Sequence, residues 1–555
     1  MNIRRFSSRE ERLAGLTPLH GGGGGPILYS EHGIHYQSLT QGHTLVLGRS
    51  GAGKTTSVTQ TTVCGELAAG RSVVVLDAKG TVYEATRGFA EQGGYPCVCL
   101  DLSCPQSSPH THNPLRVIYE NLASADPLRV SWACEDIFEF GEAIVPTDEK
   151  DPYWHDSAVE LICGVIHTVC ALGQADEVNL VSVMRTLTEG NIQVAQSTNF
   201  KQLFAFLEDS LAKRYLTTYA NAPHNTALSM FSVANTSVER LVSSPLMERF
   251  LGAESFRLSE LDLQRPFIIY IIVPDETTSV YPLAAVILAQ IVRHLLRAAR
   301  HQYHGTLPVP CTVIVEELGS MGRCIPQLPE LLSSARSRGI AMLLCMQSLR
   351  QLDMIYGEAR AAIIRDNSET LLAFAGKDPA GLEQLAASAG GFSVRTHGGV
   401  IRRPVVTAER LAAMEVGQVF VQRPSGIQYI TRLPRFDAVY RLPPSGPETA
   451  HPRAPYRVFS LDEYIRRRRK EQLDSLLGKN SFPPLLEDLS SDDAKKRAVP
   501  KEPPFNASWR RNDEELPAKA EEEKESDLDE ADFSVLLEMK EQYLRRRGKR
   551  DRREE

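Results

Sequence analysis

The sequence lacks the features that mark membrane-spanning and secreted proteins. No apolar run reaches the roughly 20 residues that a membrane span needs, and the longest lie at residues 161–172 and 283–292. The basic start is not followed by an apolar segment, so we expect no signal peptide. The 10 cysteines are irregularly spaced, which is typical of a reducing compartment and not of a disulfide framework. These absences predict a soluble, cytoplasmic chain.

An excess of positive charge is also lacking. The formal net charge is -7, which argues against a surface that binds nucleic acid indiscriminately but leaves room for a local basic channel or loop. The chain is not poor in apolar residues, since 42% of its 555 residues are hydrophobic. This length and composition predict more than one domain, each with a core.

One stretch matches a phosphate-binding loop. Residues 48–55 fit the pattern G-x-x-x-x-G-K-[ST], between an apolar run at 44–47 that predicts a strand and a proline-free stretch at 55–68 that predicts a helix. In such a loop the backbone N–H groups and the helix N-terminus surround phosphates. We therefore expect ATP and Mg²⁺ as ligands, with the Lys54 ammonium on the β- and γ-phosphates and the Thr55 hydroxyl on Mg²⁺. The nucleotide-binding residues predicted here are Gly48, Ser50, Gly51, Ala52, Gly53, Lys54, Thr55 and Thr56.

Apolar runs alternate with helical segments on both sides of a long helical stretch. Strands are predicted at residues 72–77, 97–101, 266–273, 312–315, 340–345, 370–374 and 418–421. Residues 115–261 instead show helical spacing, and Ser157 with Glu160 predicts a capping box that opens one of the helices. The fold class expected is α/β: a nucleotide-binding domain with a parallel-rich, doubly wound sheet, interrupted by an all-α domain.

Composition predicts the domain boundaries. We expect an N-terminal extension at 1–40 that drapes over the first domain, the nucleotide-binding domain at 41–114 and 262–440, the all-α domain at 115–261, and a charged, largely disordered tail at 441–555. The basic run at 466–470 fits a solvated tail segment, although it could bind nucleic acid or acidic headgroups. Ending the chain near Arg441 is therefore expected to leave the folded core intact.

A second group of residues would complete an ATPase site. The apolar strand at 312–315 ends in Glu316, expected to hold the Mg²⁺ shell, and Glu317, expected to polarise the attacking water. Gln347 follows the strand at 340–345 and fits a sensor of the γ-phosphate, or else an ordinary polar strand end. Arg336 and Arg338 fit an arginine that reaches a neighbouring subunit's γ-phosphate, or else a solvated helix end.

The order of these segments resembles the type IV secretion coupling proteins, the TraG/TraD-like ATPases of bacterial conjugation. The resemblance covers residues 41–435, and its strongest run extends from 315 to 352. The stretches that carry it are residues 43–48, 76–80, 113–115, 151–154, 315–322, 335–340 and 347–352, with the spacing from 356–357 to 366–367.

This resemblance implies a homo-hexameric, RecA-like motor with an all-α domain at one end. Such motors recruit a relaxase bound to single-stranded DNA, or secreted protein effectors, and deliver them to the components of a type IV secretion channel. By position, Arg336 matches the arginine proposed to act across the subunit interface.

Three departures from the family pattern matter. The phosphate loop begins without the usual transmembrane helices, which implies attachment at the inner face of the membrane through an anchoring partner, or none. Glu316 stands where the family has aspartate, and Ala78 replaces a proline.

Two other functions stay open. One is a cytoplasmic DNA pump of the HerA or FtsK kind. The other is a nucleotide-gated substrate receptor that hydrolyses slowly, which the longer Glu316 side chain favours.

Overall fold

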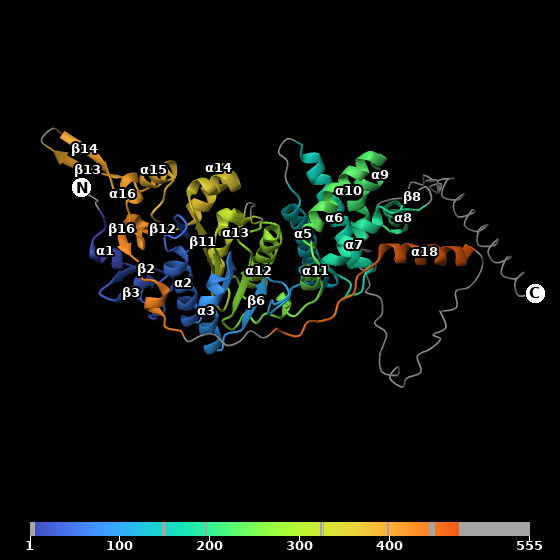
Figure 1. Ribbon diagram of the computed structural model, residues 1–555, viewed down its shortest axis with the longest axis horizontal. Coiled ribbons are helices and arrows are strands. Elements are labelled where there is room, and N and C mark those ends of the chain that lie inside the picture. Colours follow the sequence, from blue (N-terminus) through green and yellow to red (C-terminus); the bar gives the residue numbers. More distant parts are fainter. Residues whose placement is uncertain are drawn as a thin grey trace, which may run out of the picture.

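The computed structural model describes residues 6–40, 42–146, 151–194, 197–321, 325, 327–396, 399–442 and 450–476. Figure 1 shows an elongated molecule, with a sheet-containing domain at one end and a helical domain at the other. Residues 450–476 run to the helical domain and end in the long helix α18 (Leu461–Leu476).

A nine-stranded sheet forms the centre of the first domain, in the order β16-β15-β12-β4-β11-β10-β5-β9-β6. Its strands run parallel, except that β15 is antiparallel to β12 and to β16. In chain order they are β4 (Thr44–Leu47), β5 (Ser72–Asp77), β6 (Cys97–Asp101), β9 (Ile268–Ile272), β10 (Cys311–Val315), β11 (Ile340–Met346), β12 (Thr370–Phe374), β15 (Gln418–Arg423) and β16 (Ile427–Arg432). The predicted α/β sheet is confirmed, with β16 as an added edge strand.

The central strands are apolar throughout because both faces of the sheet are covered. Every residue of β4, β5, β9, β10 and β11 is buried, as expected for parallel strands between two layers of helices. Successive residues of β5 enter different cores: Val73 and Val75 pack on one face, Val74 and Leu76 on the other. The helices of this domain are α2 (Gln60–Ala68), α3 (Thr81–Gln92), α12 (Tyr281–His301), α13 (Leu328–Ala335), α14 (Leu349–Asn367), α15 (Pro379–Ser388), α16 (Ala408–Ala412) and α17 (Phe436–Val439).

The N-terminal residues form their own small sheet, where we expected an extension that drapes over the domain. After α1 (Arg9–Leu13), the strands β1 (Leu16–Pro18), β2 (Gly24–Glu31) and β3 (Ile34–Ser38) pair antiparallel in the order β1-β3-β2. Ile27 and Leu28 are almost fully buried and join the same core as α2. The many glycines obscured the strand pattern, because they contribute no apolar side chain to it.

The second domain is a helical insertion between β6 and β9, which confirms the predicted interruption of the sheet, and its one short hairpin pairs β7 (Gln193–Val194) with β8 (Ser197–Thr198) within the described residues. Its helices are α4 (Arg116–Leu122), α5 (Pro127–Ile144), α6 (Pro152–Leu172), α7 (Leu180–Gly190), α8 (Asn199–Phe206), α9 (Leu211–Asn221), α10 (His224–Glu239) and α11 (Pro245–Gly252). The predicted capping box is wrong. Helix α6 begins at Pro152, and the Ser157 hydroxyl donates to the carbonyl of Tyr153 at 2.6 Å within the helix.

Helices α6 and α12 are longer than the uninterrupted apolar runs that they contain. Each has 21 residues and is apolar enough to pass a length-and-composition test for a membrane span. In each, 78% of the most apolar window is buried inside the protein. Both therefore have the surroundings of a core helix.

The tail was expected to lack structure from residue 441, and residues 450–476 contradict this. Phe459, Leu461 and Ile465 are buried against the all-α domain, where α18 contacts α7 and α8. The Ser460 hydroxyl donates to Glu189 Oε2 at 2.9 Å, and accepts from the Glu463 N–H at 3.2 Å. Charged neighbours lowered the average hydrophobicity and hid these few anchoring residues. The rest of the expected tail, 477–555, lies outside the described residues.

Ending the chain at Arg441 should lower its thermal stability, because the sites that hold Phe459, Leu461 and Ile465 become exposed. Burying an apolar side chain of this size stabilises a protein by about 1.5–3 kcal/mol. The measurement is the melting temperature by calorimetry, compared with the full chain and with a chain that ends at Leu476 as the control. Equal melting temperatures for the two shortened chains would show that this segment adds no stability.

Candidate nucleotide-binding site

Four neighbouring parallel strands place the candidate site at one edge of the sheet. The order β4-β11-β10-β5 is fixed by paired residues such as Met346 with Leu47 and Val315 with Leu344 and Leu76. Parallel strands end at a common edge, so the segments that follow them meet there. The phosphate loop, Gln347, the two acidic residues and Asp77 all lie at this edge.

The loop after β4 has the backbone of a phosphate-binding loop. Gly51 and Gly53 adopt φ angles of 74° and 103°, in the left-handed region that favours glycine. The Lys54 ammonium is buried and donates to the carbonyl oxygen of Gly48 at 2.6 Å. The chain continues as a π-helical turn, η1 (Thr55–Thr59), before α2 begins. π-helical turns are rare in proteins, and those that occur often lie at functional sites.

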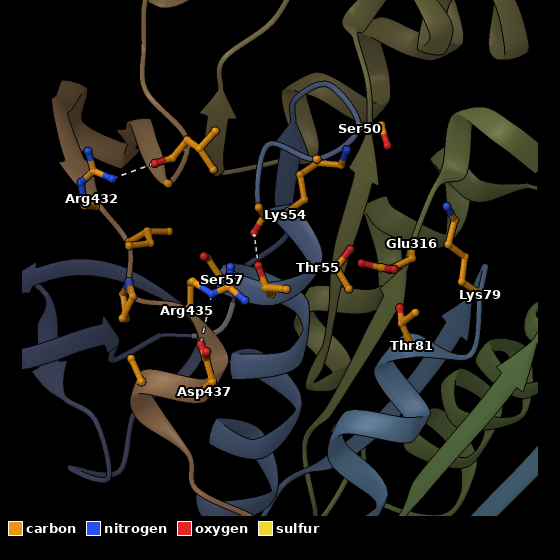
Figure 2. Close-up of a pocket in the computed structure, with 18 of the residues that line it drawn as sticks. Ser50, Lys54, Thr55, Ser57, Lys79, Thr81, Glu316, Arg432, Arg435 and Asp437 are labelled. Carbon is orange, nitrogen blue, oxygen red and sulfur yellow. Dashed lines mark hydrogen bonds and ion pairs between the residues drawn. The ribbon is translucent and has the colours of Figure 1, made fainter.

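Glu316 lies in the floor of the site, directly after β10. Its side chain is only 6% exposed, and its Oε1 accepts a hydrogen bond from the Thr59 hydroxyl at 2.9 Å. Burial, and then the charge of Asp77, raise the pKa of Glu316 to about 7, although hydrogen bonds from Thr55 and Thr59 oppose this. The Thr55 hydroxyl faces this carboxylate in Figure 2. Two hard oxygen donors at this place suit Mg²⁺, which needs few protein ligands when phosphates supply the others.

Asp77 contributes to the site in a way that sequence reasoning did not assign. Its carboxylate is fully buried and accepts from the N–H groups of Val82 at 2.8 Å and Tyr83 at 2.9 Å, so it caps the start of α3. Burial raises the pKa of Asp77 as well. Its position could have indicated this role, because Asp77 ends the apolar strand β5 just as Glu316 follows the apolar strand β10.

Glu317 connects the phosphate loop with the end of β11. Its Oε1 lies 3.6 Å from the Lys54 ammonium, and the Gln347 side-chain amide donates to its Oε2 at 3.4 Å. Glu317 has a φ of 53°, an uncommon value for a residue with a side chain. Strained backbone of this kind gathers at functional sites. The structure thus brings together Lys54, Glu317 and Gln347, three of the four predicted catalytic residues.

Arg336, the fourth, lies elsewhere. It belongs to a short 3₁₀ turn, η4 (Arg336–Arg338), that precedes β11, whereas Gln347 follows that strand. The length of β11 therefore separates Arg336 from the phosphate loop of its own chain. Its side chain is 59% exposed and forms an ion pair with Glu369.

A pocket of about 700 Å³ lies over the phosphate loop, with Lys79 from the loop after β5 and Thr81 from the start of α3 on one side (Figure 2). Its opposite wall comes from a part of the chain for which the sequence predicted no role. These residues are Val416, Gly417, Arg432, Leu433, Pro434, Arg435, Asp437 and Ala438. Val416 and Gly417 precede β15, Arg432 ends β16 and the others follow it, and no motif marks them. The strand signal at 418–421 was the only indication that this segment returns to the sheet.

Comparisons with known protein families and with solved structures both found matches to this chain. The family model described as "Type IV secretory system Conjugative DNA transfer" matches residues 8–400. The chain also resembles the conjugative coupling protein TrwB in its unbound form, with a TM-score of 0.59, 16% identity, and coverage of 81% of this chain and 97% of that one. None of the curated proteins compared with the chain matches it.

Nucleotide-bound structures of the same coupling protein are similar too. The structure with ADP and Mg²⁺ has a TM-score of 0.56, and the structure with the GTP analogue GDPNP has 0.55. Each is 17% identical and covers 74% of this chain and 88% of that one. The shared feature is the RecA-like fold.

The Glu316→Gln variant should stabilise the nucleotide-free protein more at pH 8 than at pH 5. The pKa of the Glu316 carboxyl is raised from 4.5 to about 7 in the folded state. The folded protein therefore loses stability as the pH rises from 4.5 through about 7, because folding then opposes the ionisation of this group. The amide does not ionise, so the variant avoids a cost on the order of 3 kcal/mol.

The measurement is the difference in melting temperature between this variant and the wild type at both pH values. The control is the same type of substitution, Glu to Gln, at the exposed residue Glu330. A Glu316→Gln difference that does not change with pH would contradict the raised pKa.

Proposed function

Because this chain belongs to the type IV secretory family of conjugative DNA transfer proteins, we propose that it is an ATP-hydrolysing coupling protein. It recruits a relaxase–single-stranded DNA complex, or protein effectors, and delivers it to a type IV secretion channel. The observation that carries the proposal is the meeting of Lys54, Glu317 and Gln347 over a phosphate-binding loop.

Each residue of the site has a role that its position supports. Lys54 binds the β- and γ-phosphates in place of its present contacts with Gly48 and Glu317. Glu317, released from that ion pair, orients water and accepts its proton, while Gln347 reports on the γ-phosphate through its contact with Glu317. Thr55 and Glu316 would hold Mg²⁺, which would supply positive charge to the phosphates.

The wall at 432–438 holds the nucleoside. It faces the phosphate loop across the pocket, and Leu433 and Pro434 give it apolar surface beside the Arg435–Asp437 ion pair, 3.2 Å long. A related coupling protein has been solved with adenine and guanine nucleotides alike. Leu433 and Pro434 support such tolerance, because apolar side chains offer no hydrogen bonds that distinguish one base from the other.

Arg336 acts in a neighbouring subunit of a homo-hexamer. It cannot serve its own site, since β11 lies between them. Its exposed side chain is available to a neighbour once it leaves Glu369. The protein works in the cytoplasm, at the inner face of the membrane.

One alternative has an observation in its favour. A nucleotide-gated receptor that hydrolyses slowly would agree with the raised pKa of Glu316, because a protonated acid is a poor Mg²⁺ ligand. ATP turnover that single-stranded DNA stimulates would exclude this alternative. Turnover stimulated only by duplex DNA would favour a pump of the HerA or FtsK kind.

Glu317→Gln should bind ATP almost normally and hydrolyse it at least about 100-fold more slowly, because the amide keeps the shape but cannot take a proton. Lys54→Ala should abolish turnover and weaken binding. Phosphate release and fluorescent-nucleotide binding measure the two effects, with Glu330→Gln as the control. Wild-type turnover by Glu317→Gln would refute the role given to this residue.

Arg336→Ala should bind nucleotide but lose turnover in the assembled ring. Mixing it with Lys54→Ala should restore part of the activity, because Arg336→Ala subunits keep an intact phosphate loop and their neighbours supply the arginine. The measurement is ATP turnover across mixing ratios, with native mass spectrometry to show mixed rings. Inactive mixed rings at every ratio would argue against action between subunits.

A further inference from the structure

The helix α18 presents a basic surface on the outside of the all-α domain. We define it by its consecutive residues Arg466, Arg467, Arg468, Arg469 and Lys470. All except Arg469, which is half-buried, are exposed to solvent. Figure 1 shows α18 at the outer edge of the helical domain, away from the sheet.

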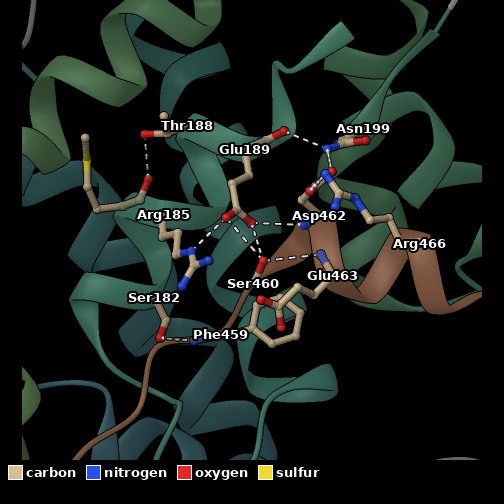
Figure 3. Close-up of polar contacts among 11 residues, drawn as sticks. Ser182, Arg185, Thr188, Glu189, Asn199, Phe459, Ser460, Asp462, Glu463 and Arg466 are labelled. Atoms are coloured by element: carbon tan, nitrogen blue, oxygen red, sulfur yellow. Dashed lines mark hydrogen bonds and ion pairs between the residues drawn. The ribbon is translucent and has the colours of Figure 1, made fainter. Parts of the chain in front are cut away.

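Contacts at the start of α18 hold this surface in place. The Glu189 carboxylate of α7 accepts from the Ser460 hydroxyl at 2.9 Å and from the Asp462 N–H at 3.0 Å (Figure 3). The Phe459 N–H donates to the Ser182 hydroxyl at 3.0 Å, and Leu461 is fully buried. The basic residues therefore occupy a defined position, and a partner need not order them at an entropic cost.

Acidic neighbours neutralise only part of this charge. Arg466 pairs with Asp462 at 2.6 Å, and Arg468 pairs with Glu471 at 3.3 Å. Within the part of the chain that the structure describes, Arg467, Arg469 and Lys470 have no carboxylate within ion-pair distance. Arg467 instead lies over the Tyr464 ring, with its guanidinium carbon 5.6 Å from the ring centre. This local excess stands out on a chain whose net charge is -7.

We propose that residues 466–470 form a phosphate-binding surface for single-stranded nucleic acid on the all-α domain. The inference rests on the proposed function and extends it, because it assigns the transported strand a contact outside the sheet domain. Guanidinium groups bind phosphate through paired N–H donors. The Arg467 plane also offers a base a surface for stacking.

A membrane surface fits this helix less well. Helices that lie on membranes insert an apolar face among the lipids. Among the apolar residues of α18, Leu461 and Ile465 are buried against the all-α domain, and Leu473 is half-buried. Residues 466–470 themselves offer a partner charge and no apolar side chain, and phosphates in a nucleic acid strand match that charge.

The test is binding of a fluorescein-labelled 30-nucleotide oligo(dT) to the full chain, without nucleotide, followed by anisotropy. Arg467→Glu/Lys470→Glu should weaken binding by roughly tenfold or more at moderate salt. The slope of log Kd against log salt should fall by about 1.4, since each phosphate contact with a single strand contributes about 0.7. Arg265→Glu/Arg300→Glu is the matched control, because it changes the net charge equally at exposed positions of the sheet domain.

Unchanged binding by the α18 variant, equal losses in both variants, or no binding by the wild type would each overturn the proposal. The proposal would also be overturned if the Arg467→Glu/Lys470→Glu variant lost binding to phosphatidylglycerol vesicles but still bound oligo(dT). The surface would then be a membrane contact. Melting temperatures must match the wild type. Where the Arg467→Glu/Lys470→Glu chain melts early, Arg467→Gln/Lys470→Gln replaces it, with about half of the expected loss. The proposed function fails separately, if Lys54→Ala hydrolyses ATP like the wild type.

Discussion

The register of four parallel strands is the constraint on which the site depends. Lys54, Gln347, Glu317 and Asp77 come from four separate segments, and they meet because β4, β11, β10 and β5 end at one edge. Shifting one strand by one residue would turn its side chains to the other face of the sheet. It would therefore exchange residues between two different cores, such as Val74 and Val75 of β5. The cores on both faces thus protect the geometry of the site.

The same edge concentrates negative charge where burial opposes it. Glu316 and Asp77 are both buried, each pKa is raised, and Asp77 adds to the shift of Glu316. A site built in this way is costly without cations and becomes favourable when positive charge arrives. Lys54 supplies part of that charge through its contact with Glu317, 3.6 Å away. Replacement of that contact by phosphate would then free Glu317 for its own role.

The residues that could be predicted share one property, which is that their role is decided locally. The bounds of β4 and β5 follow from apolar runs buried on both faces, and the phosphate loop follows from its glycines. The fold and the paired acids were therefore readable in order along the chain. For Arg336 the sequence could supply a position but not its ion-pair partner, Glu369. The two residues lie far apart in the sequence, so their ion pair leaves no local pattern.

Two features could not be predicted from the sequence: the pocket wall at 432–438 and the packing of residues 450–476. Both depend on contacts between segments that are far apart in the sequence. The wall at 432–438 reaches the phosphate loop only because β15 and β16 return antiparallel to the sheet. Residues 450–476 pack through a handful of side chains within a strongly charged stretch. Average composition cannot distinguish such a segment from a solvated tail, since its averages are the same whether or not the anchoring positions face a neighbour.

The two domains share one continuous core of buried side chains. Ile162 of α6 and Ile291 of α12 belong to the same continuous group of buried side chains. Beside this group, the buried Arg293 of α12 pairs with the buried Asp136 of α5 at 3.0 Å. Arg293 also pairs with Glu139, and Asp136 also pairs with Arg297 at 2.7 Å, so a network of largely buried charges joins α5 to α12. The all-α domain and the sheet domain are therefore joined by a continuous core and by buried charges, and this core includes Leu461 and Ile465, which place the basic surface of α18 relative to the nucleotide site.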